Sequence, residues 1–174
     1  ALEYVWKISD EGLKGIKLHP PLQRADVDDK RLFPVYDLAR ALNLVVVFHA
    51  GWDATYRDEM RASVEMTINV VKNFPGLKLV AAHMGGLRLA RDVFDHLAGK
   101  YDLYFDTAYA ADPWLDKEMF RDIIHRHGAE RILFGSDYPW HLPSMEIGLI
   151  NSLDIGEEEK KMILGENAAR LLGL

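Results

Sequence analysis

The chain has 174 residues, of which 49% are hydrophobic and 28% charged, an ordinary balance for a folded globular protein with a sizeable core. The formal net charge of −6 argues against a nucleic-acid surface, and no apolar run approaches the ~20 residues that a membrane helix needs. With no cysteine there is no disulfide and no thiolate metal site, so a metal would need imidazole and carboxylate ligands. We therefore expect a cytoplasmic protein whose partner is a small molecule.

The first half of the chain alternates between helix and strand patterns. Residues 1–12 have the pattern of an amphipathic helix that ends at a glycine. Leu13–Pro20 (LKGIKLHP) predicts a short strand, in which period two places Lys17 and His19 on one face, assigned to the interior of a sheet or barrel. The double proline then ends strand pairing. The next expected elements are a helix at Lys30–Leu42 with Pro34 in its first turn, a strand at Leu44–Gly51 and a helix at Met60–Asn73.

The second half continues the same alternation. No linker or low-complexity segment divides it, so residues 1–174 are expected to form a single domain. The expected elements are strands at Leu77–Gly86, Tyr101–Tyr109 and Arg131–Pro139, helices at Leu87–Ala98 and Asp112–His127, and two short helical pieces from Glu157 onward, separated by Gly165 and Asn167.

Five strands that alternate with helices every thirty residues or so indicate right-handed βαβ units and a parallel sheet. Two architectures fit this pattern. An open doubly wound sheet matches the chain length, whereas a closed eight-stranded barrel typically needs about 250 residues. However, the sequence has no glycine-rich phosphate loop, and functional residue types at nearly every strand end favour a barrel.

Three predicted strands end in residue types that bind metals. His49 ends the run LVVVFHAG, His83 ends LKLVAAHMGG, and Asp137 follows ILFGS. Alone, such a histidine is usually structural, and such an aspartate often caps a turn. Because the carboxyl ends of parallel strands meet at one edge of a sheet, the recurrence predicts a shared site.

Other chemically capable residues lie in the loops after strand ends or on helices. Loops at strand ends commonly set specificity, although packing of loop against rim is the favoured interpretation for the aromatic residues. His125 and His127 are assigned to a solvated helix end, and His96 to an outer helix face. The loop residues are Trp52, Asp53, Arg57, Tyr109, Trp140 and His141.

As an ordered set, the segments GIKLHP, FHAG, AAHMGG, FGSDYP and GENAARLLGL resemble the amidohydrolase superfamily. The most similar branch contains aminocarboxymuconate semialdehyde decarboxylase, orthohydroxybenzoate decarboxylases and the pyrone dicarboxylate lactonase. The resemblance covers essentially the whole chain. It implies an α/β fold of the TIM-barrel (β/α)₈ type, of which this chain holds roughly strands four to eight. His49, His83 and Asp137 match the histidines of the fifth and sixth strands and the aspartate of the eighth.

The resemblance also implies roles for these residues. His49 would bind a divalent metal, zinc first, with manganese or iron as alternatives. Asp137 would contact the metal and its water and act as a general base. His83 would be a second-metal ligand or, as we prefer, a catalytic histidine. The expected substrate-binding residues are Lys17, His19, Trp52, Arg57 and Tyr109, although Lys17 could instead be a structural ammonium or a carboxylated bridge between metals, and His19 could instead fix its loop.

One family feature is missing from the sequence. The first strand of the family carries a His-x-His pair that supplies two metal ligands, and the nearest pattern here, His125-Arg126-His127, lies on a predicted helix. Together with a start at Ala1, this suggests a fragment of a longer chain, or a homodimer that closes the barrel.

Three functions therefore remain open at this level. The leading hypothesis is metal-dependent hydrolysis of an amide, ester or lactone bond in a small molecule. The alternative is non-oxidative decarboxylation of an aromatic or unsaturated acid at the same metal site. The third hypothesis is a catalytically incomplete fragment that acts only as a folding or interaction unit.

Overall fold

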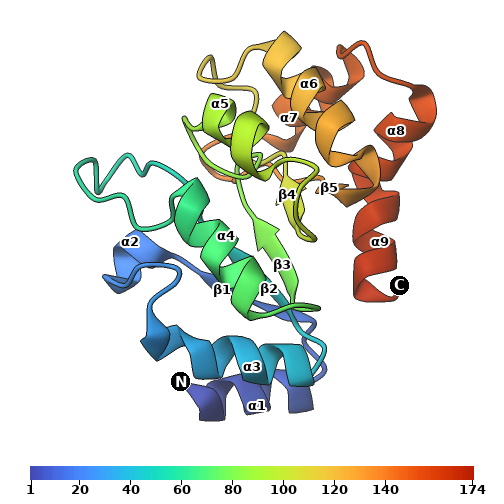
Figure 1. Ribbon diagram of the computed structural model, residues 1–174. Helices are drawn as coiled ribbons and strands as arrows, with labels where there is room; N and C mark the ends of the chain where they lie inside the picture. The colour runs from blue at the N-terminus through green and yellow to red at the C-terminus, as the bar shows by residue number, and fades with distance from the viewer.

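The computed structural model describes all residues from 1 to 174 and contains one parallel sheet (Figure 1). Its strands are paired in the order in which they occur in the chain, without the reversal that a doubly wound sheet requires. This order is that of consecutive strands in a barrel wall, as predicted. The strands are β1 (Gly15–Leu18), β2 (Val45–Phe48), β3 (Lys78–Ala81), β4 (Tyr104–Asp106) and β5 (Ile132–Leu133).

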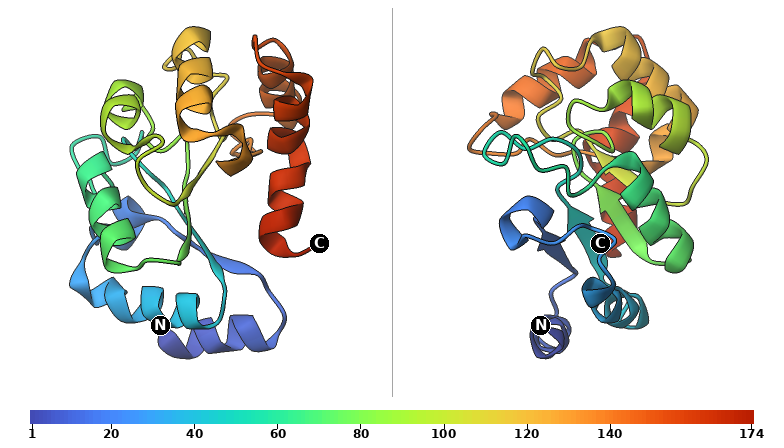
Figure 2. Two further views of the ribbon diagram at one scale, coloured as in Figure 1. Left: turned by 45° about the vertical axis from the view of Figure 1, so that its right-hand side comes forward. Right: turned by 60° about the vertical axis from the view of Figure 1, so that its left-hand side comes forward.

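Helices connect the strands, and α3, α4 and α6 pack along one face of the sheet (Figures 1 and 2). No helix is both long and apolar enough to cross a membrane. The α-helices are α1 (Leu2–Asp10), α2 (Pro20–Gln23), α3 (Phe33–Ala41), α4 (Val64–Asn73), α5 (Ala90–Asp92), α6 (Lys117–His127), α7 (Pro143–Asn151), α8 (Glu157–Lys161) and α9 (Asn167–Leu172). Two 3₁₀ turns (Lys30–Leu32 and Ala129–Arg131) and two π-helical turns (Val93–Leu97 and Met162–Glu166) complete the set.

The two faces of the sheet bury different clusters because side chains alternate along each strand. Val46, Leu79 and Phe105 face the helices and belong to a hydrophobic core of 33 buried residues. The residues between them face the inside of the barrel wall, where Leu171 of α9 covers part of that face. This smaller cluster contains Val45, Val80, Leu133 and Leu171.

All five predicted strands exist, but each is shorter than its apolar run. β3 ends at Ala81 and β5 at Leu133, so His83 and Asp137 lie in the turns that follow rather than in the strands. Pro20 and Pro21 do end β1, and they also begin the short helix α2, for which His19 is the N-cap. Proline is tolerated there because the first turn of a helix needs no backbone donor.

Two predicted helices start later in the structure, because a capping side chain fixes the first residue of each. Ser63 Oγ accepts a hydrogen bond from Met66 N–H at 3.2 Å, so α4 begins at Val64 rather than Met60. The carboxylate of Asp116 caps α6 in the same way, with Met119 N–H at 2.8 Å. These side chains satisfy backbone donors that the helix itself leaves free.

The C-terminal third differs most from the prediction. Helix α7 was missed, since its sequence PSMEIGLIN has no side-chain N-cap and an internal glycine. The two predicted pieces after Glu157 form one continuous helical run to Leu172, because a π-helical turn carries the backbone across Gly165.

The prediction of a solvated His127 is wrong. His125 and His96 are exposed as expected, but His127 is completely buried. Its Nε2 donates to Leu103 O at 3.0 Å, its Nδ1 accepts from Gly99 N–H at 3.2 Å, and its ring stacks on Phe105 with centroids 3.9 Å apart. Burial, with a smaller effect of the nearby Arg131 charge, lowers the pKa of His127 to about 4.

This buried histidine makes the fold sensitive to acid. The folded-state pKa of His127 lies below the unfolded value of about 6.5, so the unfolded chain binds the proton more strongly, and stability falls as the pH drops from 6.5 towards 4. Between pH 7 and pH 5 this group should remove about 2 kcal/mol from the free energy of unfolding. Urea unfolding of the wild type and of His127→Gln at pH 7 and pH 5 measures this loss of stability, which should be smaller in the variant. An equal loss of stability in the two proteins would contradict this assignment.

Candidate metal centre

Three histidines meet at the carboxyl edge of β1, β2 and β3. His83 Nε2 lies 3.0 Å from His49 Nδ1, and the rings of His19 and His49 are stacked with centroids 4.7 Å apart. The pairing of these strands places Leu18, Phe48 and Ala81 in one row, so the residues that follow emerge at one place. The structure thus brings His49 and His83 into direct contact, and their shared role in a functional site stays a prediction.

The loop after β2 brings a carboxylate to this group. Asp53 Oδ2 lies 3.4 Å from His19 Nε2 and 3.7 Å from His49 Nε2. The other oxygen of Asp53 accepts the backbone N–H groups of Thr55 and Tyr56, which fixes the side chain. His19, His49 and Asp53 each offer one ligand atom, and these atoms lie within 4.8 Å of one another. The sequence had placed Asp53 only in a specificity loop.

The number of protons on the histidine rings, compared with the number of hydrogen bonds they make, tests whether a metal fits this site. His83 Nδ1 faces Ala108 O at 3.0 Å, and His49 Nε2 faces Trp52 O at 3.0 Å. With the contact between the two rings, these three hydrogen bonds need three ring protons, whereas two neutral imidazoles carry two. Burial, reinforced by the nearby His83 and His19, lowers the pKa of His49 to about 3, so that ring stays neutral.

A cation resolves the shortage of protons. When His83 Nδ1–H donates to Ala108 O and His49 Nδ1–H donates to His83, the lone pair of His49 Nε2 is left facing Trp52 O as well as His19 and Asp53, and a cation at Nε2 would take the place of the missing proton. Two imidazoles and a carboxylate form a donor set that suits zinc, iron or manganese. A cation there would also offset the charge of Asp53, whose residue is only 8% exposed. The residues therefore fit a divalent metal.

The backbone around His83 fixes the orientation of its ring. His83 is buried and has a left-handed φ of 59°. Asp106 Oδ1 accepts both the His83 N–H at 2.9 Å and the Ala108 N–H at 3.1 Å. Asp106 was not among the predicted site residues, because its role depends on a turn from another strand.

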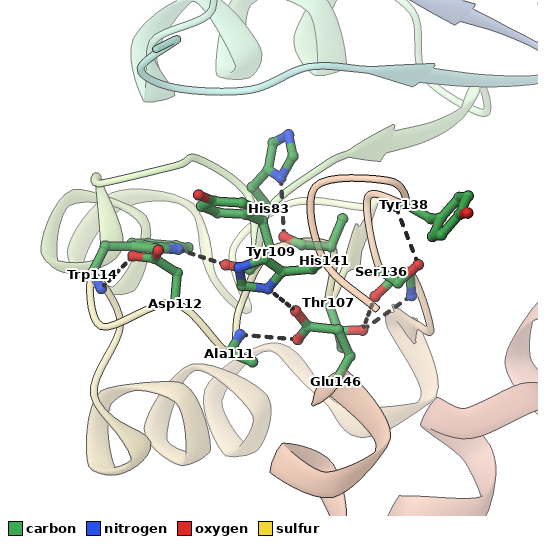
Figure 3. Close-up of polar contacts among 12 residues, drawn as sticks. His83, Thr107, Tyr109, Ala111, Asp112, Trp114, Ser136, Tyr138, His141 and Glu146 are labelled. Carbon is green, nitrogen blue, oxygen red and sulfur yellow. Dashed lines mark hydrogen bonds and ion pairs between the residues drawn. The ribbon is translucent and has the colours of Figure 1, made fainter. Parts of the chain in front are cut away.

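Tyr109 lies near His83 (Figure 3), and together with Arg88 and Trp52 it forms a polar and aromatic rim beside the histidines. The Arg88 guanidinium stacks over the Trp52 ring, with Cζ 3.8 Å from the centroid. Burial raises the pKa of Tyr109, and the carboxylates of Asp112 and Asp137 act in the same direction while Arg88 opposes them. Tyr109 therefore remains a neutral phenol that can donate a hydrogen bond.

The predicted substrate-binding residues divide into two groups. His19 belongs to the metal-ligand group, and Trp52 and Tyr109 belong to the rim. Lys17 is exposed on β1, and Arg57 is exposed with its Nε donating to Ala54 O, so neither joins the histidines. Both stay as predictions without a contact that supports them.

Asp137 is not among the ligand atoms that gather around His19 and His49. It is exposed in the turn after β5, with a left-handed φ of 63°, and its charge contributes to the raised pKa of Tyr109. Its roles as metal ligand and general base stay predictions. His141, predicted in a loop, is buried against Glu146. Glu146 was not predicted as a site residue, because α7 itself was missed.

Comparison with known proteins decides the family. The profile of the Amidohydrolase family matches residues 2–174. The chain belongs to the amidohydrolase family. It is 25% identical over 205 aligned residues to 2-amino-3-carboxymuconate-6-semialdehyde decarboxylase of Dictyostelium discoideum, covering 96% of this chain and 55% of the relative. The amidohydrolase chain thus spans about half the length of this curated relative, and the predicted resemblance is confirmed.

Solved structures confirm the TIM-barrel fold. An uncharacterised TIM-barrel protein of Bordetella bronchiseptica superimposes with a TM-score of 0.81 and 24% identity, covering 99% of this chain and 62% of that one. A dihydroxybenzoic acid decarboxylase of Polaromonas, solved with manganese and the inhibitor 2-nitroresorcinol, gives a TM-score of 0.75 and 17% identity, covering 100% of this chain and 65% of that one.

Two sets of candidate metal ligands can be distinguished by experiment. The structure groups His19, His49 and Asp53, whereas the sequence predicts His49, His83 and Asp137. Both include His49, so His49→Ala should abolish stoichiometric Mn²⁺ or Zn²⁺ binding. Asp53→Asn should weaken binding on the order of tenfold or more, because it removes the charged oxygen of the assembled group. Calorimetry and elemental analysis measure both effects. Asp58→Asn, an exposed carboxylate of the same loop, is the control. A loss with Asp137→Asn but none with Asp53→Asn would instead support the set predicted from sequence.

Proposed function

We propose that this chain carries the metal and acid–base residues of a divalent-metal-dependent enzyme that decarboxylates small aromatic or unsaturated acids. The observation that carries the proposal is the chain of contacts from Ala108 O through His83 and His49 to His19 and Asp53. It sets a candidate metal site directly beside a buried, oriented histidine. The names of the Dictyostelium relative and the Polaromonas structure support this reaction class.

The rim supplies groups that suit an acidic substrate. The Arg88 side chain is exposed and stacked on Trp52, so its in-plane N–H groups stay free to bind a carboxylate or phenolate. The Tyr109 phenol can donate a further hydrogen bond. A planar acid held by Arg88 would lie between this rim and His83.

The reaction breaks the bond between the ring or vinyl carbon and the carboxyl carbon, which leaves as carbon dioxide, and the electron pair stays on the substrate carbon. A proton must then reach that carbon. Asp137 is the proposed carrier, which would take a proton from solvent and pass it to the carbon, because it is exposed in the turn after β5 beside Tyr109. His83, held by Ala108 O, would orient the substrate. A bound divalent metal would supply Lewis-acid stabilisation of the developing negative charge.

Hydrolysis of an ester, amide or lactone is the second candidate. The exposed Asp137 carboxylate favours it, since a base in contact with solvent can take a proton from an attacking water. The two reactions differ in their products, because decarboxylation releases carbon dioxide and hydrolysis releases a new acid.

An activity test separates the two reactions. We expect the chain with Mn²⁺ to release carbon dioxide from one or more members of a panel of hydroxybenzoates and to leave lactones intact. Asp137→Asn should abolish turnover while the circular dichroism spectrum stays unchanged. Acid production from lactones without carbon dioxide release would support hydrolysis, and no turnover of either class would support the incomplete-fragment hypothesis.

A variant of Arg88 tests the rim. Arg88→Gln should raise KM for an acidic substrate on the order of tenfold or more, with a smaller change in kcat, because a charged hydrogen bond to the carboxylate is lost. Arg91→Gln is the matched control, since Arg91 is an exposed arginine three residues away that pairs with Asp95. Equal effects of both substitutions would refute the specific role of Arg88.

A further inference from the structure

A second buried polar pair lies behind the rim, outside the metal-ligand group. Glu146 in the first turn of α7 is completely buried, and His141 is 8% exposed. His141 Nδ1 lies 2.8 Å from Glu146 Oε1, and the other oxygen of Glu146 accepts the Ala111 N–H at 2.9 Å. Each carboxyl oxygen of Glu146 therefore has a hydrogen-bond partner, and the two partners come from two different loops.

These contacts join the loop after β4 to the loop after β5 (Figure 3). A carboxyl group is costly to bury unless its oxygens are paired, so the two loops must keep their places for Glu146 to stay inside. The two oxygens of Glu146 have different partners. Oε1 contacts the His141 side chain in the loop after β5, and Oε2 accepts the Ala111 backbone N–H in the loop after β4.

Tyr109 is the residue on which this link acts. Its ring lies over that of His141, with centroids 4.1 Å apart, and its backbone is left-handed with φ 62° (Figure 3). A bulky residue keeps such a backbone only where its surroundings hold it. Trp114 Nε1 donates to Tyr109 O at 2.8 Å, and Ala111 is tied to Glu146 two residues later.

The same short segment also orients the buried histidine. Ala108 O, one residue before Tyr109, is the partner of His83 Nδ1. A shift of the segment from 108 to 111 would therefore move the Tyr109 phenol and release the His83 ring together. The metal-ligand atoms of His19, His49 and Asp53 come from other loops, and only His49 contacts His83, so these atoms would move less than Tyr109 and the His83 ring.

We propose that His141 and Glu146 are positioning residues of this site, which hold Tyr109 at the rim and Ala108 O against His83. The inference rests on the proposed function, because it concerns the geometry of the same site. It predicts a separation of effects, with substrate turnover depending on the pair more strongly than metal binding does.

The test compares Glu146→Gln and His141→Phe with wild type and with Glu158→Gln, which changes an exposed glutamate in a surface ion pair with Lys161. Phenylalanine at position 141 can still stack on Tyr109 but cannot bond to Glu146. Both variants should lower kcat by about 10- to 100-fold, lower Mn²⁺ affinity much less than kcat, and shift the imidazole NMR signals of His83. Glu158→Gln should change none of these.

Unchanged kcat together with unchanged His83 signals in both variants would overturn the inference. If His141→Phe does not fold, because it leaves the buried Glu146 Oε1 without its partner, the uncharged Glu146→Gln, which keeps the shape of the side chain, decides alone. If the wild-type chain decarboxylates no acid, the proposed function fails, but the His83 signals still test the positioning role because they require no substrate. A loss of Mn²⁺ affinity equal to the loss of kcat would also count against a role confined to Tyr109 and His83.

Discussion

The register of the parallel sheet is the constraint on which the site depends. The His49 N–H donates to Leu18 O at 3.1 Å and the Ala82 N–H donates to Phe48 O at 3.0 Å, so the ladder continues to the end of each strand. The residues that leave the ladder emerge at one edge, where His19, His49 and His83 come into contact. A slip of one residue would turn these side chains to the other face of the sheet.

Unusual backbone geometry is concentrated at this same edge. Left-handed non-glycine residues recur in the turns after β3, β4 and β5, and such conformations persist only where the surrounding structure determines them. Asp106 fixes the turn that carries His83, and Glu146 fixes the turn that carries Tyr109. The left-handed residues at this edge are His83, Met84, Arg88, Tyr109 and Asp137.

The candidate metal-ligand group and the buried His83 are connected through one residue, His49. One nitrogen of its ring faces the His19 and Asp53 donors, and the other contacts His83, so a cation on the first side would influence the second directly. Because burial keeps His49 neutral, the ring can serve as a ligand without losing a proton. This arrangement is consistent with membership of the amidohydrolase family, whose profile matches almost the whole chain.

The sequence by itself determined the alternation of five strands with helices and the placement of His49 and His83 at strand ends, because hydrophobic periodicity and glycine positions are local signals. The contacts of Asp53 with His19, the link from Glu146 to Ala111 and the burial of His127 were decided only by the tertiary structure. Each of these depends on atoms from segments distant along the chain. Periodicity reports which face of an element is buried, but it carries no information about which loop lies opposite.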